Sequence, residues 1–145
     1  MPEDRVAVVD GSNIAYAEMS ASGKPKVSNI VGVCRNLRER GFRPVVIVDA
    51  SLRHVVDDPD QLEGLMDEQD VRQAPAGTQA DYFVLEVADD LGAPVVSNDG
   101  FDEYREQYPW IEERRIPLMI VGGEVVLHEP SLRQMRQQAD EARSG

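Results

Sequence analysis

The sequence predicts a three-layer α/β fold with a mostly parallel central sheet. Two near-continuous apolar runs, at residues 5–10 and 44–49, flank an amphipathic segment that predicts a helix over residues 28–40. Strand, helix and strand in this order are typical of a βαβ unit, and strands apolar on both faces favour a sheet covered on both sides. The pattern repeats further along the chain. The length of 145 residues fits a single domain, residues 1–145, with its core over about residues 5–130.

The elements of the first half have clear boundary signals. Both apolar strands are rich in Val and end in an Asp, and Gly11 follows the first of them. In the helix between them, Ser28 is the predicted N-cap, apolar residues recur at helical spacing, and Gly41 ends the helix. Cys34 lies in this apolar stripe, so we expect a small core residue and not a nucleophile.

The second half predicts further strands and one well-defined helix. That helix covers residues 78–91 with Phe83, Val84, Val87, Ala88 and Leu91 facing the core, and Gly92 ends it. Strands are expected at residues 71–74, 93–97 and 116–121, a hairpin strand at 124–127, and a polar helix or tail at 131–145.

Composition excludes several classes of protein. One cysteine is too few for an intramolecular disulfide or a thiolate metal cluster. No apolar run is long enough to cross a bilayer, and the acidic N-terminus does not resemble a signal peptide. We therefore expect a cytoplasmic protein that does not associate with membranes.

The charge is strongly negative. Asp and Glu number 27 against 15 Lys and Arg, of which only Lys24 and Lys26 are Lys, and the net charge is −12. This pattern predicts a halophilic protein, with an ordinary acidic protein as the alternative. It also disfavours tight electrostatic binding of duplex DNA. Residues 57–70 hold seven acidic side chains, whereas residues 24–43 hold six basic ones opposed only by Glu39, which predicts a solvated helix face or an edge that follows phosphates.

Three carboxylates are placed where an α/β fold binds ligands. Asp10 ends the first strand, Asp99 follows the strand at residues 93–97, and Asp81 lies in the first turn of the preceding helix. Carboxylates that share a site suit a hard cation such as Mg²⁺ or Mn²⁺, which can activate water against a phosphodiester. Each residue also has a simpler explanation: Asp10 and Asp99 precede turn glycines, and Asp81 has capping-box spacing from Thr78.

Other chemistries have little support. The chain contains no P-loop and no G-x-G-x-x-G motif. His54 and His128 lack the spacing of metal ligands, and core packing is the expected role of Trp110.

Several motifs resemble those of a known family. Val8-Val9-Asp10-Gly11-Ser12-Asn13 is similar to the first strand and loop of NYN domains, a branch of the PIN-like nucleases, and Val95-Val96-Ser97-Asn98-Asp99 is similar to the family's Val-Ser-Asn-Asp. Asp81-Tyr82-Phe83 looks like the family's Asp-x-Phe, and Leu52-Arg53 stands where the family has Trp-Arg. The likeness covers residues 5–130 and is closest to the ribonuclease domain of the CCCH-zinc-finger endoribonucleases of the Regnase type.

The resemblance implies a Mg²⁺- or Mn²⁺-dependent ribonuclease on a PIN-like α/β/α sandwich, cutting single-stranded RNA internally. Its acidic cluster corresponds to Asp10, Asn13, Asp81 and Asp99, of which the three aspartates would hold the metal. Two positions depart from the family pattern: Ala80 stands in place of an Asp, and Glu103 in place of another. The expected outer-shell residues are Ser12, Ser97, Asp102 and Glu103, and the expected RNA-backbone contacts are Lys24, Lys26, Arg35, Arg38 and Arg53.

Two other functions remain open at this point. Ala80 and the negative net charge favour a non-catalytic PIN-like module that binds RNA or acts as a scaffold. A metal-dependent phosphatase is the second alternative, although the first strand is not followed by a D-x-D pair. One cysteine does not suffice for a CCCH zinc finger, so we expect any RNA-targeting module to be a separate partner chain or to be absent. A homodimer is the other expected partnership.

Overall fold

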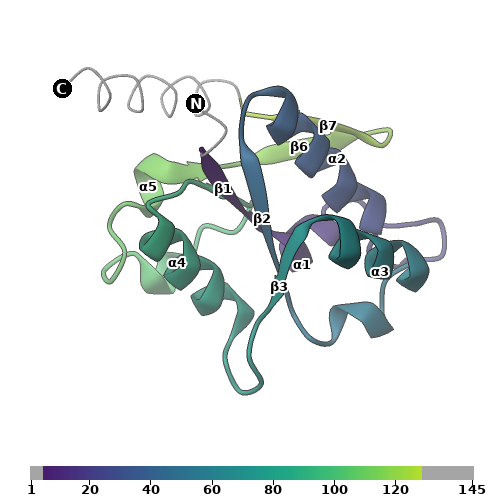
Figure 1. Ribbon diagram of the computed structural model, residues 1–145, viewed down its shortest axis with the longest axis horizontal. Coiled ribbons are helices and arrows are strands. Elements are labelled where there is room, and N and C mark those ends of the chain that lie inside the picture. Colours follow the sequence, from purple (N-terminus) through teal and green to yellow (C-terminus); the bar gives the residue numbers. More distant parts are fainter. Residues whose placement is uncertain (1–4, 129–145) are drawn as a thin grey trace.

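The computed structural model describes residues 5–128, which form a five-stranded sheet between two layers of helices (Figure 1). The strand order is β3-β2-β1-β4-β5, and each neighbouring pair is parallel. The strands are β1 (Val6–Asp10), β2 (Arg43–Val48), β3 (Asp70–Gln73), β4 (Val95–Val96) and β5 (Arg115–Ile116), and a separate antiparallel hairpin is made by β6 (Leu118–Val121) and β7 (Glu124–Leu127). The predicted α/β fold is therefore confirmed, whereas the predicted C-terminal helix or tail lies outside the described residues.

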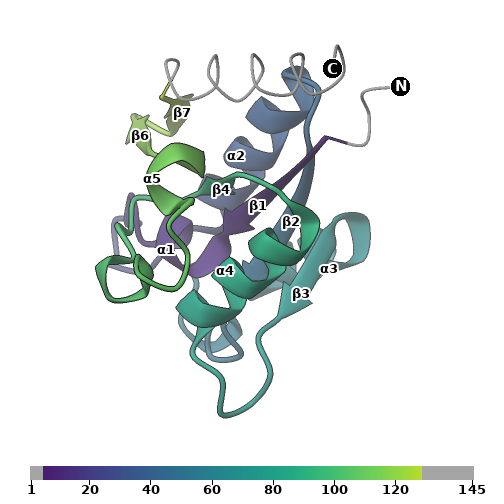
Figure 2. The ribbon, with the colours of Figure 1, turned by 90° about the vertical axis from the view of Figure 1, so that its left-hand side faces the viewer.

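Helices cover both faces of the sheet (Figure 2). Within residues 5–128, the α-helices are α1 (Gly11–Ala15), α2 (Val27–Glu39), α3 (Pro59–Glu68), α4 (Ala80–Leu91) and α5 (Ile111–Arg114). The same part of the chain contains the short 3₁₀ helices η2 (Leu52–His54) and η3 (Asp102–Tyr104). Residues of α2, α3 and the hairpin pack in one core, and residues of α4 and α5 pack in the other. None of the helices within residues 5–128 has the length and apolar character needed to cross a membrane.

The apolar strands supply both cores at once. In β1, Ala7 and Val9 face the α2–α3 side, while Val8 faces the α4 side. In β2, Val46 and Val48 belong to the first core, and Val45 and Ile47 to the second. Because side chains alternate across a strand and both faces are covered, the strands are apolar at nearly every position.

The topology creates a ligand-binding edge beside β1. The chain passes from β1 to β2 and β3 on one side, and then returns to β4 on the other side of β1. The connections after β1 and β3 therefore diverge, which leaves a crevice at the carboxyl ends of β1 and β4. Asp10 is the last residue of β1, so it stands at this crevice.

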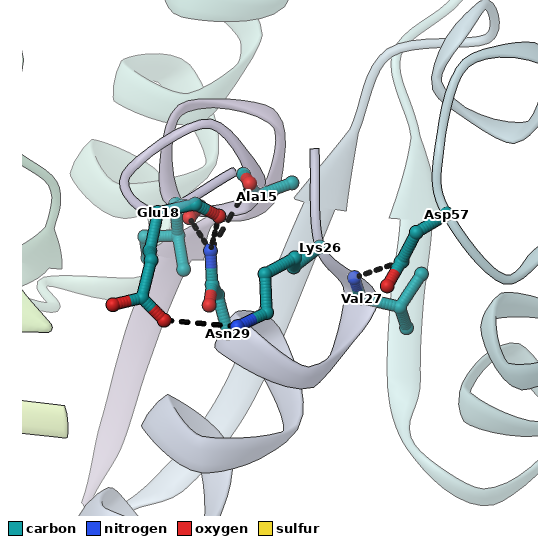
Figure 3. Close-up of polar contacts among 7 residues, drawn as sticks. Ala15, Glu18, Lys26, Val27, Asn29 and Asp57 are labelled. Carbon is teal, nitrogen blue, oxygen red and sulfur yellow. Dashed lines mark hydrogen bonds and ion pairs between the residues drawn. The ribbon is translucent and has the colours of Figure 1, made fainter. Parts of the chain in front are cut away.

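The start of α2 differs from the sequence prediction. The helix begins at Val27, and the predicted capping role of Ser28 is wrong. The Val27 N–H instead donates to Oδ1 of Asp57, 3.1 Å away and thirty residues later in the chain (Figure 3). A cap from so distant a residue leaves no local sequence signal.

A buried amide joins α2 to the end of α1. Asn29 Nδ2 donates to the carbonyl oxygens of Ile14, Ala15 and Glu18 at 3.1, 3.1 and 2.9 Å (Figure 3). These carbonyls lie at or beyond the end of a helix, where they have few backbone donors. Lys26 Nζ adds an ion pair with Glu18 at 2.9 Å. The loop after α1 is thereby fixed against α2.

Other differences have local causes. The predicted strand at residues 116–121 is divided at Pro117, which has no N–H to donate, so β5 joins the main sheet and β6 joins the hairpin. The short helix α1 and the acidic helix α3 are absent from the sequence prediction. Helix α3 has strong signals, because Asp58 accepts the Gln61 N–H at 3.0 Å and Pro59 occupies its first turn. Leu91 is exposed, not inward-facing as predicted, because α4 ends at it.

Candidate active site

Asp10 is the buried centre of the site. Its carboxyl is almost inaccessible, with 2% of the residue exposed. Val9 of β1 pairs with Val96, the last residue of β4, so the residues that follow them in the chain, Asp10 and Ser97, lie side by side. Ser97 Oγ donates to Oδ2 of Asp10 at 2.8 Å. The parallel register of two neighbouring strands therefore brings the two motifs noted in the sequence into direct contact.

The residues after β4 form a tight hydrogen-bonded turn. The Asp99 N–H donates to Ser97 Oγ at 3.0 Å, and Oδ1 of Asp99 accepts the Phe101 N–H at 2.9 Å. Phe101 has a φ of 50°, in the left-handed region that non-glycine residues seldom adopt, while its side chain is buried. Burial of this ring offsets the backbone strain and fixes the turn that presents Asp99.

Asn13 connects α1 to the same turn. Its Oδ1 accepts the Asn98 N–H at 3.1 Å, and Asn98 Oδ1 in turn accepts the Leu118 N–H at 2.8 Å. Arg115 Nη1 donates to the Ser97 carbonyl at 3.2 Å. Sequence reasoning missed Asn98 and Arg115 as supports of the site. Asn98 belongs to the recognised motif, whereas nothing near Arg115 in the sequence indicates this contact.

Asp81 approaches from the other side of the crevice. The N-cap position of α4 is Gln79, and no side chain caps this helix. The capping-box alternative for Thr78 and Asp81 is therefore not realised. Asp81 and Asp99 face each other closely enough for their carboxyl groups to share a hydrogen bond when one of them is protonated.

Burial and neighbouring carboxylates shift the pKa of both Asp10 and Asp81. Burial raises the pKa of Asp10 to about 7; the Ser97 hydrogen bond opposes this rise, and the charges of Asp81 and Asp99 add to it. Burial also raises the pKa of Asp81, followed by repulsion from Asp99. Clustered groups with raised pKa values are typical of functional sites, because each carboxylate is stabilised when a positive charge binds among them.

Gly11 is required by close packing at the start of α1. A Cβ at this position would lie 2.7 Å from the Ile47 carbonyl oxygen and 3.0 Å from Cγ1 of both Val46 and Val48. No side chain fits there without movement of the β2 backbone. The glycine allows α1 to begin directly after Asp10, and this places Asn13 beside the turn that follows β4.

The four predicted outer-shell residues lie at different distances from the carboxylate cluster. Ser97 contacts Asp10 directly, and Ser12 Oγ accepts the Asp49 N–H at 3.0 Å, which ties α1 to the end of β2. Glu103 is close enough to Asp81 to raise the pKa of its carboxyl, after burial and Asp99. Asp102 is highly exposed and pairs with Arg105 at 3.3 Å, so the structure does not bring it into the carboxylate cluster.

The predicted RNA contacts lie on two different edges. Arg53 follows β2 and donates to Oε1 of Gln73 at the end of β3, so it stands at the carboxyl edge of the sheet. Lys24 and Lys26 precede α2 at the same edge. Arg38 lies in the last turn of α2 and donates to Gln69, just before β3, which places it at the opposite edge. Arg35 lies one turn earlier and lines a cavity between α2 and α3 with Arg38.

Other sequence predictions have simple outcomes. Cys34 is buried, as predicted, and burial raises the pKa of its thiol to about 11, so it stays protonated near neutral pH. Trp110 is half-buried, packs against the α4-side core, and donates to Oδ1 of Asp89 at 2.8 Å.

The carboxylate oxygens of Asp10, Asp81 and Asp99 are ligands of the kind that a hard cation prefers. No three His, Cys, Asp or Glu side chains between residues 5 and 128 are grouped tightly enough to form a ready-made metal site. Three carboxylates nevertheless converge, and no basic side chain of the described part of the chain is hydrogen-bonded to them. Two of them are close enough to share a proton. Oxygen ligands and a need for positive charge match Mg²⁺ or Mn²⁺.

Comparison with known proteins agrees with this description. Two structures of the nuclear protein-only RNase P 2 (PRORP2) of Arabidopsis thaliana share the fold, with TM-scores of 0.69 and 0.68 at 24% and 23% sequence identity. Each match covers 86% of this chain but only 29% and 30% of the PRORP2 chains. A search of the curated proteins finds no significant match. A family model described as the Zc3h12a-like ribonuclease NYN domain matches residues 3–141. The chain therefore belongs to the family of Zc3h12a-like ribonuclease NYN domains.

Proposed function

We propose that this ribonuclease domain hydrolyses internal phosphodiester bonds of single-stranded RNA with the help of Mg²⁺ or Mn²⁺. The observation that supports the proposal most strongly is the convergence of Asp10, Asp81 and Asp99 at the crevice between β1 and β4. Such a crevice is where α/β folds bind their ligands. The family also consists of ribonuclease domains.

Each residue of the cluster has a role in this proposal. Asp10, Asp81 and Asp99 would hold the cation, some of them through water. A bound cation would lower the pKa of a water molecule and offset negative charge on phosphate oxygens. Asn13 would orient a water or a phosphate oxygen with its amide nitrogen, since its carbonyl oxygen is occupied by the Asn98 N–H. Ser97 keeps Asp10 oriented, and Ser12 keeps α1 in place.

Charge and position support a single-stranded substrate. A net charge of −12 repels the dense phosphates of a duplex, whereas a single strand needs only a narrow contact. Arg53, Lys24 and Lys26 lie at the carboxyl edge of the sheet and would contact the RNA backbone on either side of the cut.

The test is incubation of end-labelled single-stranded RNA with and without Mg²⁺ or Mn²⁺. We expect internal fragments only when the metal is present. Ala80 at the start of α4, where the family pattern has Asp, favours the alternative of a non-catalytic RNA-binding module. That alternative predicts retention of RNA without cleavage, and a phosphatase would hydrolyse p-nitrophenyl phosphate but leave RNA intact.

Addition of Mg²⁺ or Mn²⁺ should raise the melting temperature of the protein. A ligand that binds only the folded state stabilises it by mass action, by about 2.7 kcal/mol at one hundred times its Kd. For a domain of this size, that corresponds to a shift of roughly 5–15 °C. Thermal melts followed by circular dichroism at constant ionic strength measure the shift.

The site is tested with Asp99→Asn. The matched control is Asp67→Asn, which removes an exposed carboxylate of α3. The shift should shrink sharply in Asp99→Asn and persist in Asp67→Asn. Equal shifts in the wild type and in Asp99→Asn would mean that the ions act on the acidic surface in general and that the assignment of the site is wrong.

A further inference from the structure

A shallow cavity adjoins the carboxylate cluster. It has a volume of about 340 Å³ and is lined by Gly77, Thr78, Gln79, Tyr82 and Tyr104. The first three of these precede α4 or stand at its N-cap, and Tyr82 follows Asp81 directly. Tyr104 ends η3, which contains Glu103. The walls of the cavity are therefore formed by the same two segments that present Asp81 and Glu103.

The cavity is within electrostatic reach of the cluster. Burial and then the negative charges of Glu103, Asp81 and Asp99 raise the pKa of the Tyr104 hydroxyl. A ligand group that occupies the cavity would accordingly be a neighbour of a phosphate held at the carboxylates. In a single-stranded nucleic acid, the neutral group nearest to a phosphate and large enough for such a cavity is a nucleobase.

The aromatic rings are held in place before any ligand binds. The rings of Tyr82 and Tyr104 have centroids 5.9 Å apart and are tilted by 44°. Tyr82 also contacts the buried ring of Tyr108 at 6.3 Å, so it is supported from the core. The Tyr104 hydroxyl donates to Oε1 of Gln79 at 2.7 Å, which connects η3 to the start of α4. Rings fixed in this way lose little conformational entropy when a planar ligand stacks on them.

The rim of the cavity offers polar groups for the edge of a planar ligand. Gln79 Oε1 is engaged by Tyr104, but its Nε2 has no hydrogen-bond partner within residues 5–128, and neither does the Thr78 hydroxyl. Gly77 has a φ of +84°, and a Cβ there would meet no atom within 4 Å, so the backbone is open at this side. Stacking surfaces with a few unused donors and acceptors match the chemistry of a nucleobase.

We propose that the cavity lined by Tyr82 and Tyr104 is a nucleobase subsite, which stacks a base next to the scissile phosphate on the Tyr104 ring. This inference rests on the proposed function, because it assumes that single-stranded RNA is the substrate. The subsite orients the RNA strand relative to the carboxylates. It contacts the substrate at a base and not at the reacting phosphate, so it contributes mainly to binding.

The first test is steady-state cleavage of an unmodified oligoribonucleotide. Stacking on an aromatic ring contributes about 1–3 kcal/mol per base, which corresponds to roughly 5- to 150-fold in affinity. Tyr104→Ala should therefore raise KM by about tenfold with kcat changed less than threefold. Tyr104→Phe keeps the ring and loses only the hydroxyl, so it should retain a KM within about threefold of the wild type. Tyr16→Ala removes an exposed tyrosine outside the cavity and is the matched control.

The second test separates base stacking from a structural role of Tyr104. The substrates are oligoribonucleotides that each carry one abasic residue, placed in turn at the positions that flank the cut. One of them lacks the base that would stack on Tyr104. At one of these positions, the abasic residue should raise the KM of the wild type by as much as Tyr104→Ala raises it. The same abasic residue should not raise the KM of the Tyr104→Ala variant any further. If the increases in KM caused by the abasic residue and by Tyr104→Ala multiply at every position, the proposed subsite is refuted, while the proposed cleavage activity is not affected.

A binding measurement tests the subsite without cleavage. Asp10→Asn protein with EDTA is titrated into a single-stranded oligoribonucleotide that contains 2-aminopurine, whose fluorescence is quenched by stacking. Quenching is expected with Asp10→Asn and should be absent with the double variant Asp10→Asn, Tyr104→Ala. Quenching in the absence of any cleavage by the wild type would overturn the proposed catalysis and keep the subsite, whereas cleavage without Tyr104-dependent quenching would overturn the subsite alone.

Discussion

Asp10→Asn is expected to reduce the cleavage of single-stranded RNA at least about 100-fold. Loss of even an indirect partner of a metal ligand typically reduces activity 10- to 100-fold, and Asp10 stands at the centre of the carboxylate cluster. The amide has nearly the same shape as the carboxyl, and its oxygen still accepts the hydrogen bond from Ser97 Oγ. The variant should therefore fold normally but lose its RNA cleavage activity.

The measurement is the initial rate with end-labelled RNA, together with a circular dichroism spectrum of each protein. Asp90→Asn is the matched control, because it makes the same substitution at an exposed position near the end of α4. That control should cleave at the wild-type rate. An Asp10→Asn protein that cleaves as fast as Asp90→Asn would refute the role assigned to Asp10, and so would an inactive variant that has lost its fold.

The stability of the metal-free protein should decrease between about pH 4 and pH 7 because of Asp10. Burial raises the pKa of its carboxyl from 3.8 to about 7 in the folded state. Between these values the folded protein holds a proton that the unfolded chain has released, so the free energy of unfolding falls as the pH rises. Each unit of pKa difference corresponds to 1.36 kcal/mol, which sets an upper limit of a few kcal/mol for the total effect.

Asp10→Asn removes this titration and should be more stable than the wild type at pH 8 in EDTA. At pH 4 the two proteins should differ little, because Asp10 is then protonated in the folded state. Urea unfolding at both pH values gives the two differences in free energy. Asp81 shifts in the same direction, and comparison with the Asn variant isolates the part due to Asp10. A difference that does not change with pH would mean that Asp10 is ionised throughout this range in the folded protein.

These two predictions are connected by one physical trade-off. The buried carboxyl of Asp10 has an unfavourable charge without a cation, and the same burial makes it a strong partner when a cation is bound. The proposed activity would therefore require an arrangement that lowers the stability of the metal-free fold. Stabilisation by the Asn substitution and loss of cleavage are expected together for this reason.

Local patterns in the sequence were sufficient to predict the fold class and to place Asp10 and Asp99 at one edge of the sheet. The apolar runs at β1 and β2 predict a parallel sheet because each strand must be buried on both faces. Asp10 and Asp99 could be placed at one edge because the carboxyl ends of parallel strands share an edge. The family membership agrees with the resemblance found in the motifs around Asp10, Asp81 and Asp99.

Features that depend on distant contacts could not be predicted in this way. The start of α2 depends on Asp57, and the break at Pro117 separates two sheets that the sequence presents as one apolar run. Arg38 belongs to a basic stretch, but its place in the last turn of α2 puts it at the edge opposite Asp10.

The sequence by itself determined which residue types are available to the site: three aspartates, Gly11 after the first strand, and Asn13. Only the tertiary structure decided how they act together. The register of β1 with β4 sets the contact of Ser97 with Asp10, and the packing of α4 brings Asp81 to Asp99. The physical reason is that strand register and helix packing are fixed by side chains distributed over the whole core. The charges of the site, by contrast, are local and can be identified from short motifs.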